Sequence, residues 1–200
     1  MKYLQLLMVA GMQAVNVAIE SREQYLLSDV ADAKGASQAT QEQAIAKLPE
    51  IIMTMLRHPD LFARLTDVGV QLLAKGEVPA RERELAVLRI AWLCKAPYEF
   101  GEHVFVAKKV GVTSADIDRV KIGSAASGWS AHEAAVLRAV EELHRDAVIS
   151  DATWTVLAKT YTDKQLIELP VVIGVYQATA YYQNSLKLRL HGGNRGLEAG

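Results

Sequence analysis

Residues 84–103 read Glu-Leu-Ala-Val-Leu-Arg-Ile-Ala-Trp-Leu-Cys-Lys-Ala-Pro-Tyr-Glu-Phe-Gly-Glu-His, and this stretch decides the fold. Leu85, Leu88 and Trp92 recur at helical spacing and form one apolar stripe. Pro97 breaks that run, because proline cannot continue a helix but is well suited to start one. The sequence therefore predicts a helix, a turn and a second helix.

Three ionisable side chains lie around this predicted hairpin. Glu99 and His103 are four residues apart, so they share a face of the second helix. Glu84 lies on the first helix and meets them if the two helices pack together. Carboxylates around an imidazole can take up and release protons near neutral pH. We therefore expect any chemistry of this chain to be located here.

The remainder of the chain reads as successive amphipathic helices. Their starts and stops are marked by helix-entry prolines, Ser/Thr-x-x-acid patterns and glycines. These signals predict a helix between His58-Pro59-Asp60 and Gly76, one from Tyr98 to Val110 with Gly111 as its C-cap, starts at Thr113 to Asp116 and at Ser130 to Glu133, a short helix around Trp154 to Tyr161, and a long one from Leu166 to Leu186. No segment alternates as a strand would, so the predicted fold class is all-α.

Composition limits the classes of function. Half of the 200 residues are hydrophobic, which is enough for one domain with a core, and the length also allows a small second lobe. The net charge of −1 with scattered basic residues argues against nucleic acid as a partner. The single cysteine, Cys94, cannot form an internal disulfide, and no Cys/His grouping has zinc-site spacing. Nothing in the composition requires an oxidising compartment.

The N-terminal residues leave two readings open. Lys2 and the apolar residues after it resemble a short signal peptide over residues 1–20, but polar residues interrupt the run and it is too short to span a bilayer. We prefer a helix packed on the domain or on a neighbouring subunit, and therefore a cytoplasmic protein without a membrane contact. The predicted organisation is an N-terminal helix and loop (1–40), a main domain (41–190) and a flexible tail (191–200).

Three segments resemble the carboxymuconolactone decarboxylase and AhpD-like superfamily. They are Arg81-Glu-Arg-Glu-Leu-Ala-Val-Leu-Arg-Ile-Ala-Trp92, Tyr98-Glu99-Phe100-x-x-His103, and Gly111-Val-Thr113 with Ile117. A weaker likeness extends over residues 44–190. The resemblance implies an all-α, AhpD-like helical bundle in which a helical hairpin carries the site, usually within a homo-oligomer.

The peroxidase branch of that superfamily carries a Cys-x-x-Cys pair, and this chain does not. When the family's histidine is aligned with His103, Ala96 and Glu99 stand at the two cysteine positions and Glu84 at an upstream glutamate. Peroxide reduction by the family route needs a thiolate nucleophile and usually a resolving thiol. We therefore expect no such activity, and Cys94, two residues before the first position, is read as a small core residue.

The decarboxylase branch works without thiols and also has a glutamate four residues before the histidine, which implies a cofactor-free acid–base enzyme. His103 is then the proton carrier, Glu84 orients its ring, and Glu99 is either a second acid or base or a group that tunes the pKa of His103. The expected substrate is a small cyclic or aromatic-derived carboxylic acid or lactone. The residues expected to contact it are Tyr98, Arg89 as a carboxylate clamp, Tyr176 and Asn184.

Other interpretations remain open at this stage. Glu99 and His103 form an exposed ion pair in the simplest reading, and the tyrosines of the last helix belong to the core or an interface. A metal held by Glu84, Glu99 and His103 is disfavoured, because Glu-Phe-Gly-Glu-His matches neither a zinc nor a di-iron motif. A non-catalytic small-ligand-binding protein and an oxidoreductase using Cys94 are the two alternative functions.

Overall fold

The computed structural model describes residues 49–200, and the chain divides into two units, Met1–Gly76 and Glu77–Gly200. The boundary at Gly76 lies well after the one expected at residue 40. The predicted N-terminal helix, loop and signal peptide lie outside the described residues. Each unit is described by itself below.

The described part of the first unit consists of α5 (Glu50–Met55) and α6 (Pro59–Ala74). The helix predicted after His58 is confirmed. Pro59 stands in its first turn, and the Nδ1 of His58 accepts a hydrogen bond from the backbone N–H of Leu61 at 3.4 Å. The histidine side chain thereby satisfies one of the amide groups that the first turn leaves without a helical partner.

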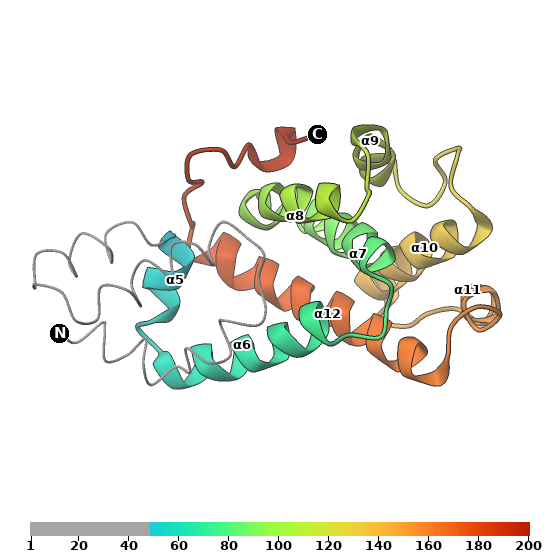
Figure 1. Cartoon of the computed structure of the whole chain (residues 1–200), viewed down its shortest axis with the longest axis horizontal. Coiled ribbons are helices and arrows are strands. Elements are labelled where there is room, and N and C mark those ends of the chain that lie inside the picture. The colour runs from blue at the N-terminus through green and yellow to red at the C-terminus, as the bar shows by residue number, and fades with distance from the viewer. Residues whose placement is uncertain (1–48) are drawn as a thin grey trace, which may run out of the picture. The chain divides into compact units, whose positions relative to one another are not determined.

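The second unit is a bundle of helices around α7. Its elements are α7 (Ala80–Leu93), α8 (Pro97–Lys109), α9 (Ser114–Ile122), α10 (Ala131–Asp146), α11 (Asp151–Leu157), α12 (Asp163–Ser185) and the 3₁₀ helix η2 (Gly196–Glu198). Helix α7 contacts α8, α9, α10 and α12 (Figure 1), and all residues from 83 to 91 are buried. Residues 49–200 contain no strand, so the predicted all-α class is confirmed.

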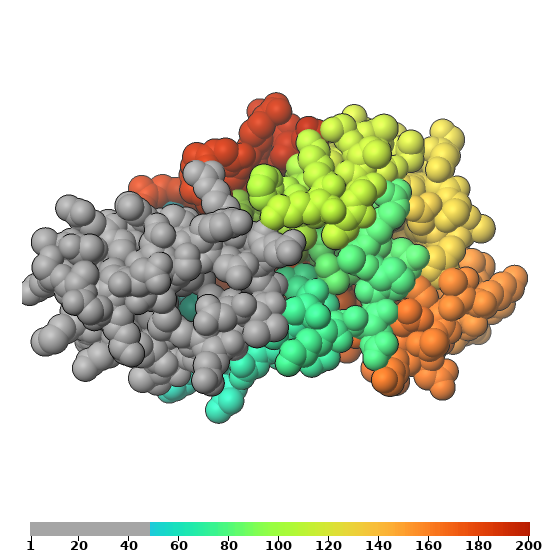
Figure 2. Space-filling view, in the orientation of Figure 1, coloured from blue at the N-terminus to red at the C-terminus, as the bar shows by residue number. Residues whose placement is uncertain are grey.

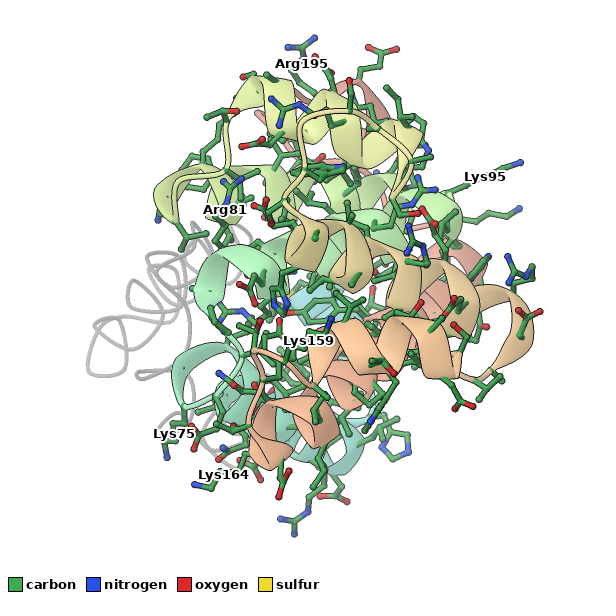
Figure 3. All side chains as sticks on the ribbon, turned by 90° about the vertical axis from the view of Figure 1, so that its right-hand side faces the viewer. Lys75, Arg81, Lys95, Lys159, Lys164 and Arg195 are labelled. Atoms are coloured by element: carbon green, nitrogen blue, oxygen red, sulfur yellow. The ribbon has the colours of Figure 1, made fainter. Side chains whose placement is uncertain are left out.

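The turn between α7 and α8 is as short as the sequence predicts. Cys94 and Lys95 follow α7, and Pro97 is the first residue of α8. Lys95 takes a left-handed conformation with φ 50°, and the N–H of Ala96 donates to the carbonyl of Ala91 at 2.9 Å. This closes the end of α7 in the manner of a C-capping motif. Lys95 points away from the helices (Figure 3).

The predicted helix starts at Thr113 and Ser130 are both capping boxes. In each, the hydroxyl accepts from the backbone three residues on, and the acidic side chain at that position, Asp116 or Glu133, accepts from the cap's own N–H. Helix α11 begins earlier than expected, at Asp151, because Ser150 caps it.

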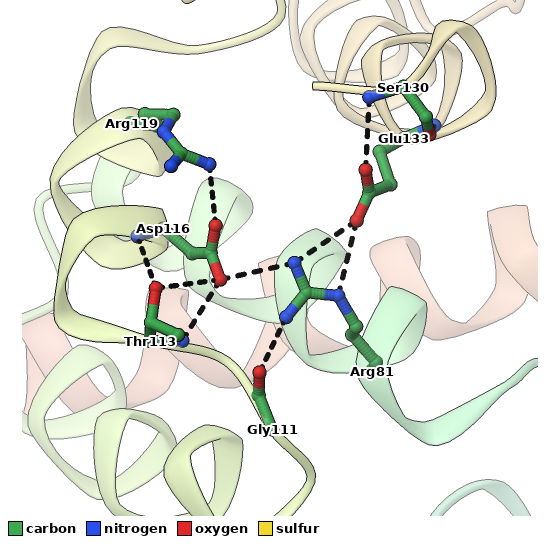
Figure 4. Close-up of polar contacts among 7 residues, drawn as sticks. All are labelled: Arg81, Gly111, Thr113, Asp116, Arg119, Ser130 and Glu133. Carbon is green, nitrogen blue, oxygen red and sulfur yellow. Dashed lines mark hydrogen bonds and ion pairs between the residues drawn. The ribbon is translucent and has the colours of Figure 1, made fainter. Parts of the chain in front are cut away.

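Arg81 joins these two capping boxes to α7 (Figure 4). Its Nε donates to Glu133 at 3.1 Å, its Nη2 to Asp116 at 3.1 Å and its Nη1 to the carbonyl of Gly111 at 2.7 Å. Burial raises the pKa of Asp116, but hydrogen bonds from Thr113 and the charge of Arg81 outweigh it and leave the pKa below its ordinary value. Arg81 thus holds the N-terminal ends of α9 and α10 beside α7.

The C-terminal residues correct one prediction, because the segment expected to be a flexible tail packs on α8. The amide nitrogen of Asn194 donates to the carbonyl of Tyr98 at 2.9 Å and to Glu102 at 2.8 Å. Gly101 makes room for the Asn194 side chain, since a Cβ there would overlap it. Ala199 is buried in the core, and the segment lies against α8 in Figure 2. These contacts were not visible in the glycine-rich sequence of the segment.

Candidate acid–base site

His103 and Glu84 meet across the hairpin, as the sequence predicts. The Nδ1 of His103 on α8 lies 2.7 Å from the Oε2 of Glu84 on α7. A carboxylate can only accept hydrogen bonds, so this contact places the ring proton on Nδ1. The Nε2 has no hydrogen-bond partner among residues 49–200, and the side chain keeps 12% of its surface exposed. Nε2 is therefore the nitrogen available to a ligand.

Glu84 is fully buried yet charged. Its second oxygen, Oε1, accepts a hydrogen bond from the Nε of Arg83 at 3.1 Å. Burial raises the pKa of Glu84, but the charges and hydrogen bonds of His103 and Arg83 outweigh it, so the pKa lies below its ordinary value. The carboxylate is thus held between the guanidinium of Arg83 and the Nδ1 of His103, and it fixes the orientation of the imidazole.

Glu99 is buried without a partner. It is 2% exposed, and neither carboxyl oxygen has a hydrogen bond among the residues that the structure describes. Burial raises its pKa well above the ordinary value, because no cation compensates for the lost hydration. Burial thus favours the uncharged form of Glu99. This excludes the simple reading of Glu99 and His103 as an exposed ion pair.

Tyr176 of α12 packs on the imidazole. The two rings meet edge to face, with centroids 4.7 Å apart and planes 88° apart. Burial raises the pKa of Tyr176, the charges of Glu84 and Glu99 add to this, and Arg83 opposes it. The structure brings Tyr176 to the site, where it was expected, and helix α12 forms one wall of the site.

Arg89 does not lie in the site, which corrects the prediction of a carboxylate clamp. Its Nε and Nη2 contact the carboxylate of Glu141 at 3.0 and 2.9 Å, and its Nη1 donates to the carbonyls of Val120 and Lys121, both at 2.9 Å. Every nitrogen of the guanidinium is thus already bonded, and the group ties α7 to α9 and α10. The apolar pattern of residues 84–93 could not show that an interior arginine would find its partners on two other helices.

Tyr98 and Asn184, the other two expected contacts, lie at the borders of the hairpin. Tyr98 is buried in the first turn of α8, where its carbonyl accepts from Asn194. The exposed Asn184 donates from its amide to the carbonyl of Cys94 at 3.0 Å. The carbonyl of Tyr98 thus helps to hold the C-terminal segment in place. The side chain of Asn184 helps to hold the backbone of the α7–α8 turn. Their contact with a substrate remains a prediction.

Cys94 has a thiol that resists ionisation. Burial, together with the charge of Glu99, raises the pKa of Cys94 to about 11. Its Sγ lies 3.9 Å from the Nδ1 of His144, which does not offset that shift. Because the thiolate is the reactive form, the thiol is a weak nucleophile at neutral pH. This argues against the alternative function in which Cys94 carries a redox reaction.

A second polar cluster, which the sequence did not reveal, lies at the N-terminal end of α7. The hydroxyl of Tyr161 donates to Glu82, whose Oε2 also lies 3.3 Å from the Nε2 of His132 on α10. The rings of His132 and Tyr161 meet edge to face, with centroids 4.6 Å apart. This cluster joins α7, α10 and the start of α12. Glu82 and Glu84 are two residues apart, so they leave α7 on opposite sides.

Part of the chain is similar to a known protein family. Residues 59–142 match the carboxymuconolactone decarboxylase family. This match agrees with the resemblance of the sequence motifs to the carboxymuconolactone decarboxylase and AhpD-like superfamily. No protein of curated function matches it significantly.

Solved structures share the AhpD-like fold at low sequence identity. A peroxidase-related protein with an AhpD core from Ralstonia eutropha is 16% identical, with a TM-score of 0.66 over 84% of this chain and 89% of the other. A peroxidase-related protein from Silicibacter sp. is 13% identical, with a TM-score of 0.67 over 84% and 90%. A cysteine-to-alanine variant of the debrominase Bmp8 in complex with 2,3,4-tribromopyrrole is 18% identical, with a TM-score of 0.65 over 90% and 93%. These similarities establish the fold alone.

Within the superfamily's hairpin, this chain has no thiol at either position of the Cys-x-x-Cys pair. Ala96 is buried directly before α8, and Glu99 occupies the first turn of that helix. No group of three His, Cys, Asp or Glu side chains in the described part of the chain is arranged to hold a metal ion. None of the helices there is long and apolar enough to cross a membrane.

The sequence pattern did not single out one residue beside this site, Arg83. It is 7% exposed, and its Nε donates a hydrogen bond to Glu84. Its position next to Glu84 in the sequence was a usable signal. On α12, Gln183 is buried and its Oε1 has no partner within residues 49–200.

Proposed function

We propose that this protein is a cofactor-free acid–base enzyme of the carboxymuconolactone decarboxylase-like type, acting on a small cyclic or aromatic-derived carboxylic acid or lactone. One observation carries the proposal. The Nδ1 of His103 is engaged by the buried carboxylate of Glu84 at 2.7 Å, while Nε2 is left for a ligand. A carboxylate in this position holds the ring orientation and stabilises the imidazolium when Nε2 takes up a proton.

The proton chemistry of a decarboxylation fits these groups. When the bond to the carboxylate carbon breaks, carbon dioxide leaves and the electron pair passes into a conjugated carbonyl of the substrate. Protonated His103 then delivers a proton from Nε2 to the substrate carbon and regains one from water. The neutral carboxyl of Glu99 is a hydrogen-bond donor for a carbonyl oxygen that gains negative charge during this step. His103 is thus the proton carrier, Glu84 orients it, and Glu99 stabilises charge.

A small ring as substrate is supported by the debrominase Bmp8, which is similar in fold and was solved with 2,3,4-tribromopyrrole. The missing cysteine pair and the raised pKa of Cys94 argue against a thiol-based reaction in this chain. Assembly into a homo-oligomer is part of the proposal and can be checked by light scattering during gel filtration of the full chain.

Turnover in heavy water tests the proposed function. A thermal-shift screen of aromatic and lactone carboxylic acids identifies ligands, and mass spectrometry then measures loss of carbon dioxide and uptake of deuterium at carbon. We expect His103→Ala to abolish both signals with the fold intact by circular dichroism. The matched control, Cys94→Ala, should keep them. Turnover that survives in His103→Ala but disappears in Cys94→Ala would overturn the proposal.

A ligand-binding protein without catalysis is the second candidate. The observation that favours it is the pair of buried groups without partners, the carboxyl of Glu99 and the Oε1 of Gln183. Such groups are costly in a folded protein unless a ligand or water satisfies them. In that case ligands from the screen bind, but no carbon dioxide is released and no deuterium is incorporated.

A further inference from the structure

Arg83 differs from the other arginines of α7 in its hydrogen bonds. All three nitrogens of Arg81 and all three of Arg89 are bonded to acceptors on neighbouring elements. The contact of Arg83 to Glu84 uses only Nε. Its Nη1 and Nη2 have no hydrogen-bond partner within residues 49–200, although the side chain is only 8% exposed. Among the residues that the structure describes, the outer edge of this nearly buried guanidinium is thus without a partner.

The unoccupied edge suits a carboxylate. The two terminal nitrogens of a guanidinium form a planar fork that matches the two oxygens of a carboxylate or the edge of another oxyanion. The interactions of such a pair are strong where water is largely excluded. Lysine would supply a point charge without this geometry.

The charges around Arg83 leave room for one negative charge. Arg83 and Glu84 neutralise each other, and burial raises the pKa of Glu99 and so favours its uncharged form. Protonation of His103 adds a positive charge beside the same carboxylate. A monoanion would therefore enter a site that is neutral or carries a single positive charge. A dianion would bring more negative charge than the positive charge of the site can balance.

Glu84 connects Arg83 to the candidate acid–base site. Its Oε1 accepts a hydrogen bond from the Nε of Arg83, and its Oε2 lies 2.7 Å from the Nδ1 of His103. The guanidinium and the imidazole therefore lie beside the same carboxylate. An anion bound by Arg83 would thus lie close to the proton carrier of the site.

We propose that Arg83 binds the anionic group of the substrate through Nη1 and Nη2. The substrate class is accordingly a small monocarboxylate. This inference rests on the proposed function for the site at which the substrate reacts. It assigns to Arg83 the role that the sequence suggested for Arg89.

Binding of benzoate and of its uncharged analogue benzamide tests the assignment without a substrate or a variant. Isothermal titration of the full-length protein should show benzoate binding at least about tenfold more tightly than benzamide, since hydrogen bonds to charged groups are worth about 1.5–3 kcal/mol. Equal binding of the two, or no binding of benzoate up to about 10 mM, where even contacts worth about 3 kcal/mol would be detectable, would overturn it.

Variants of Arg83 test whether its guanidinium is the group that binds the carboxylate of benzoate. Arg83→Gln should weaken benzoate binding at least about tenfold and leave benzamide unchanged, and Arg83→Lys should fall between them because it keeps the charge without the fork. Arg138→Gln, an exposed arginine on α10, is the matched control and should bind both as the unchanged protein does. Circular dichroism verifies that each variant is folded. Benzoate binding to folded Arg83→Gln at the original affinity would refute the proposal.

The two proposals fail in different ways. If benzoate binding depends on Arg83 but no acid releases carbon dioxide or incorporates deuterium, the anion site stands and the catalytic function fails. If turnover requires His103 but the KM of Arg83→Gln is unchanged, the catalytic function stands and Arg83 is not the anion-binding residue.

Discussion

Replacing Glu99 by glutamine should make the protein more stable than the original at neutral pH. This gain in stability should shrink as the pH falls. The structure buries both carboxyl oxygens of Glu99 without a hydrogen-bond partner among residues 49–200, and burial raises its pKa well above 4.5. Glutamine has nearly the same shape and remains uncharged at every pH. The substitution therefore removes the cost of ionising this position and little else.

The sign and size of the effect follow from proton linkage. Above the ordinary pKa of glutamate the unfolded chain has released its proton, while the folded chain keeps it, so the folded state binds more protons. Stability contributed by this group is fully present below that pKa and is lost as the pH rises toward the raised pKa of the folded protein. Within that window each pH unit lowers the free energy of unfolding by up to about 1.4 kcal/mol.

Urea unfolding followed by circular dichroism at pH 5, 6, 7 and 8 measures this effect. Other groups titrate in both proteins, so the quantity of interest is the difference between Glu99→Gln and the original at each pH, which should grow with pH. Glu198→Gln on η2, where the glutamate is exposed, should show a constant difference near zero. A difference for Glu99→Gln that is independent of pH would show that Glu99 is already ionised in the folded protein, and the neutral-donor role would be refuted.

Three further substitutions test the site and its frame. Glu84→Gln should lower kcat about 100-fold or more with the fold retained, because the amide cannot stabilise the imidazolium of His103, and steady-state kinetics measures it. Arg89→Ala leaves the carboxylate of Glu141 without its cation and should lower the free energy of unfolding, measured in urea, by about 3 kcal/mol or more. An effect below about 1 kcal/mol would contradict the structural role of Arg89. Gly101→Ala should release residues 191–200 to faster amide hydrogen exchange because its Cβ overlaps Asn194, whereas Gly174→Ala, where a Cβ meets nothing within 4 Å, should not.

The helix boundaries could be predicted because the signals that start and stop each helix are local. The capping boxes at Thr113 and Ser130, the proline at 97 and the left-handed glycine at 111, with φ 85°, each act through backbone groups within a few residues. The meeting of His103 with Glu84 was also predictable, because a three-residue turn leaves two successive helices little choice but to pack side by side. The C-terminal segment was not predictable, since Asn194 finds its partners on a helix more than ninety residues earlier.

The arginines of α7 show what the sequence alone could not predict, namely the partners of each guanidinium. Three of them lie within nine residues, and by type and spacing Arg81, Arg83 and Arg89 are indistinguishable. Their partners lie on α9, on α10, in the loop after α8 or next to them on α7, at sequence separations from one residue to more than fifty. Only the three-dimensional packing decides which guanidinium is saturated. The sequence therefore suggested Arg89 as an arginine clamp, whereas the structure shows that its guanidinium is already fully bonded.

The same packing supplies a criterion for function in a buried helix. Because α7 is enclosed on all sides, each charged side chain on it must recover its lost hydration from partners, and the structural arginines do so completely. Arg83 is the exception on α7, because only its Nε is bonded among residues 49–200. Through Glu84 it lies beside His103, whose Nε2 also has no partner among these residues. A guanidinium fork and a proton carrier held by one buried carboxylate are the groups that binding and protonating a small acid require.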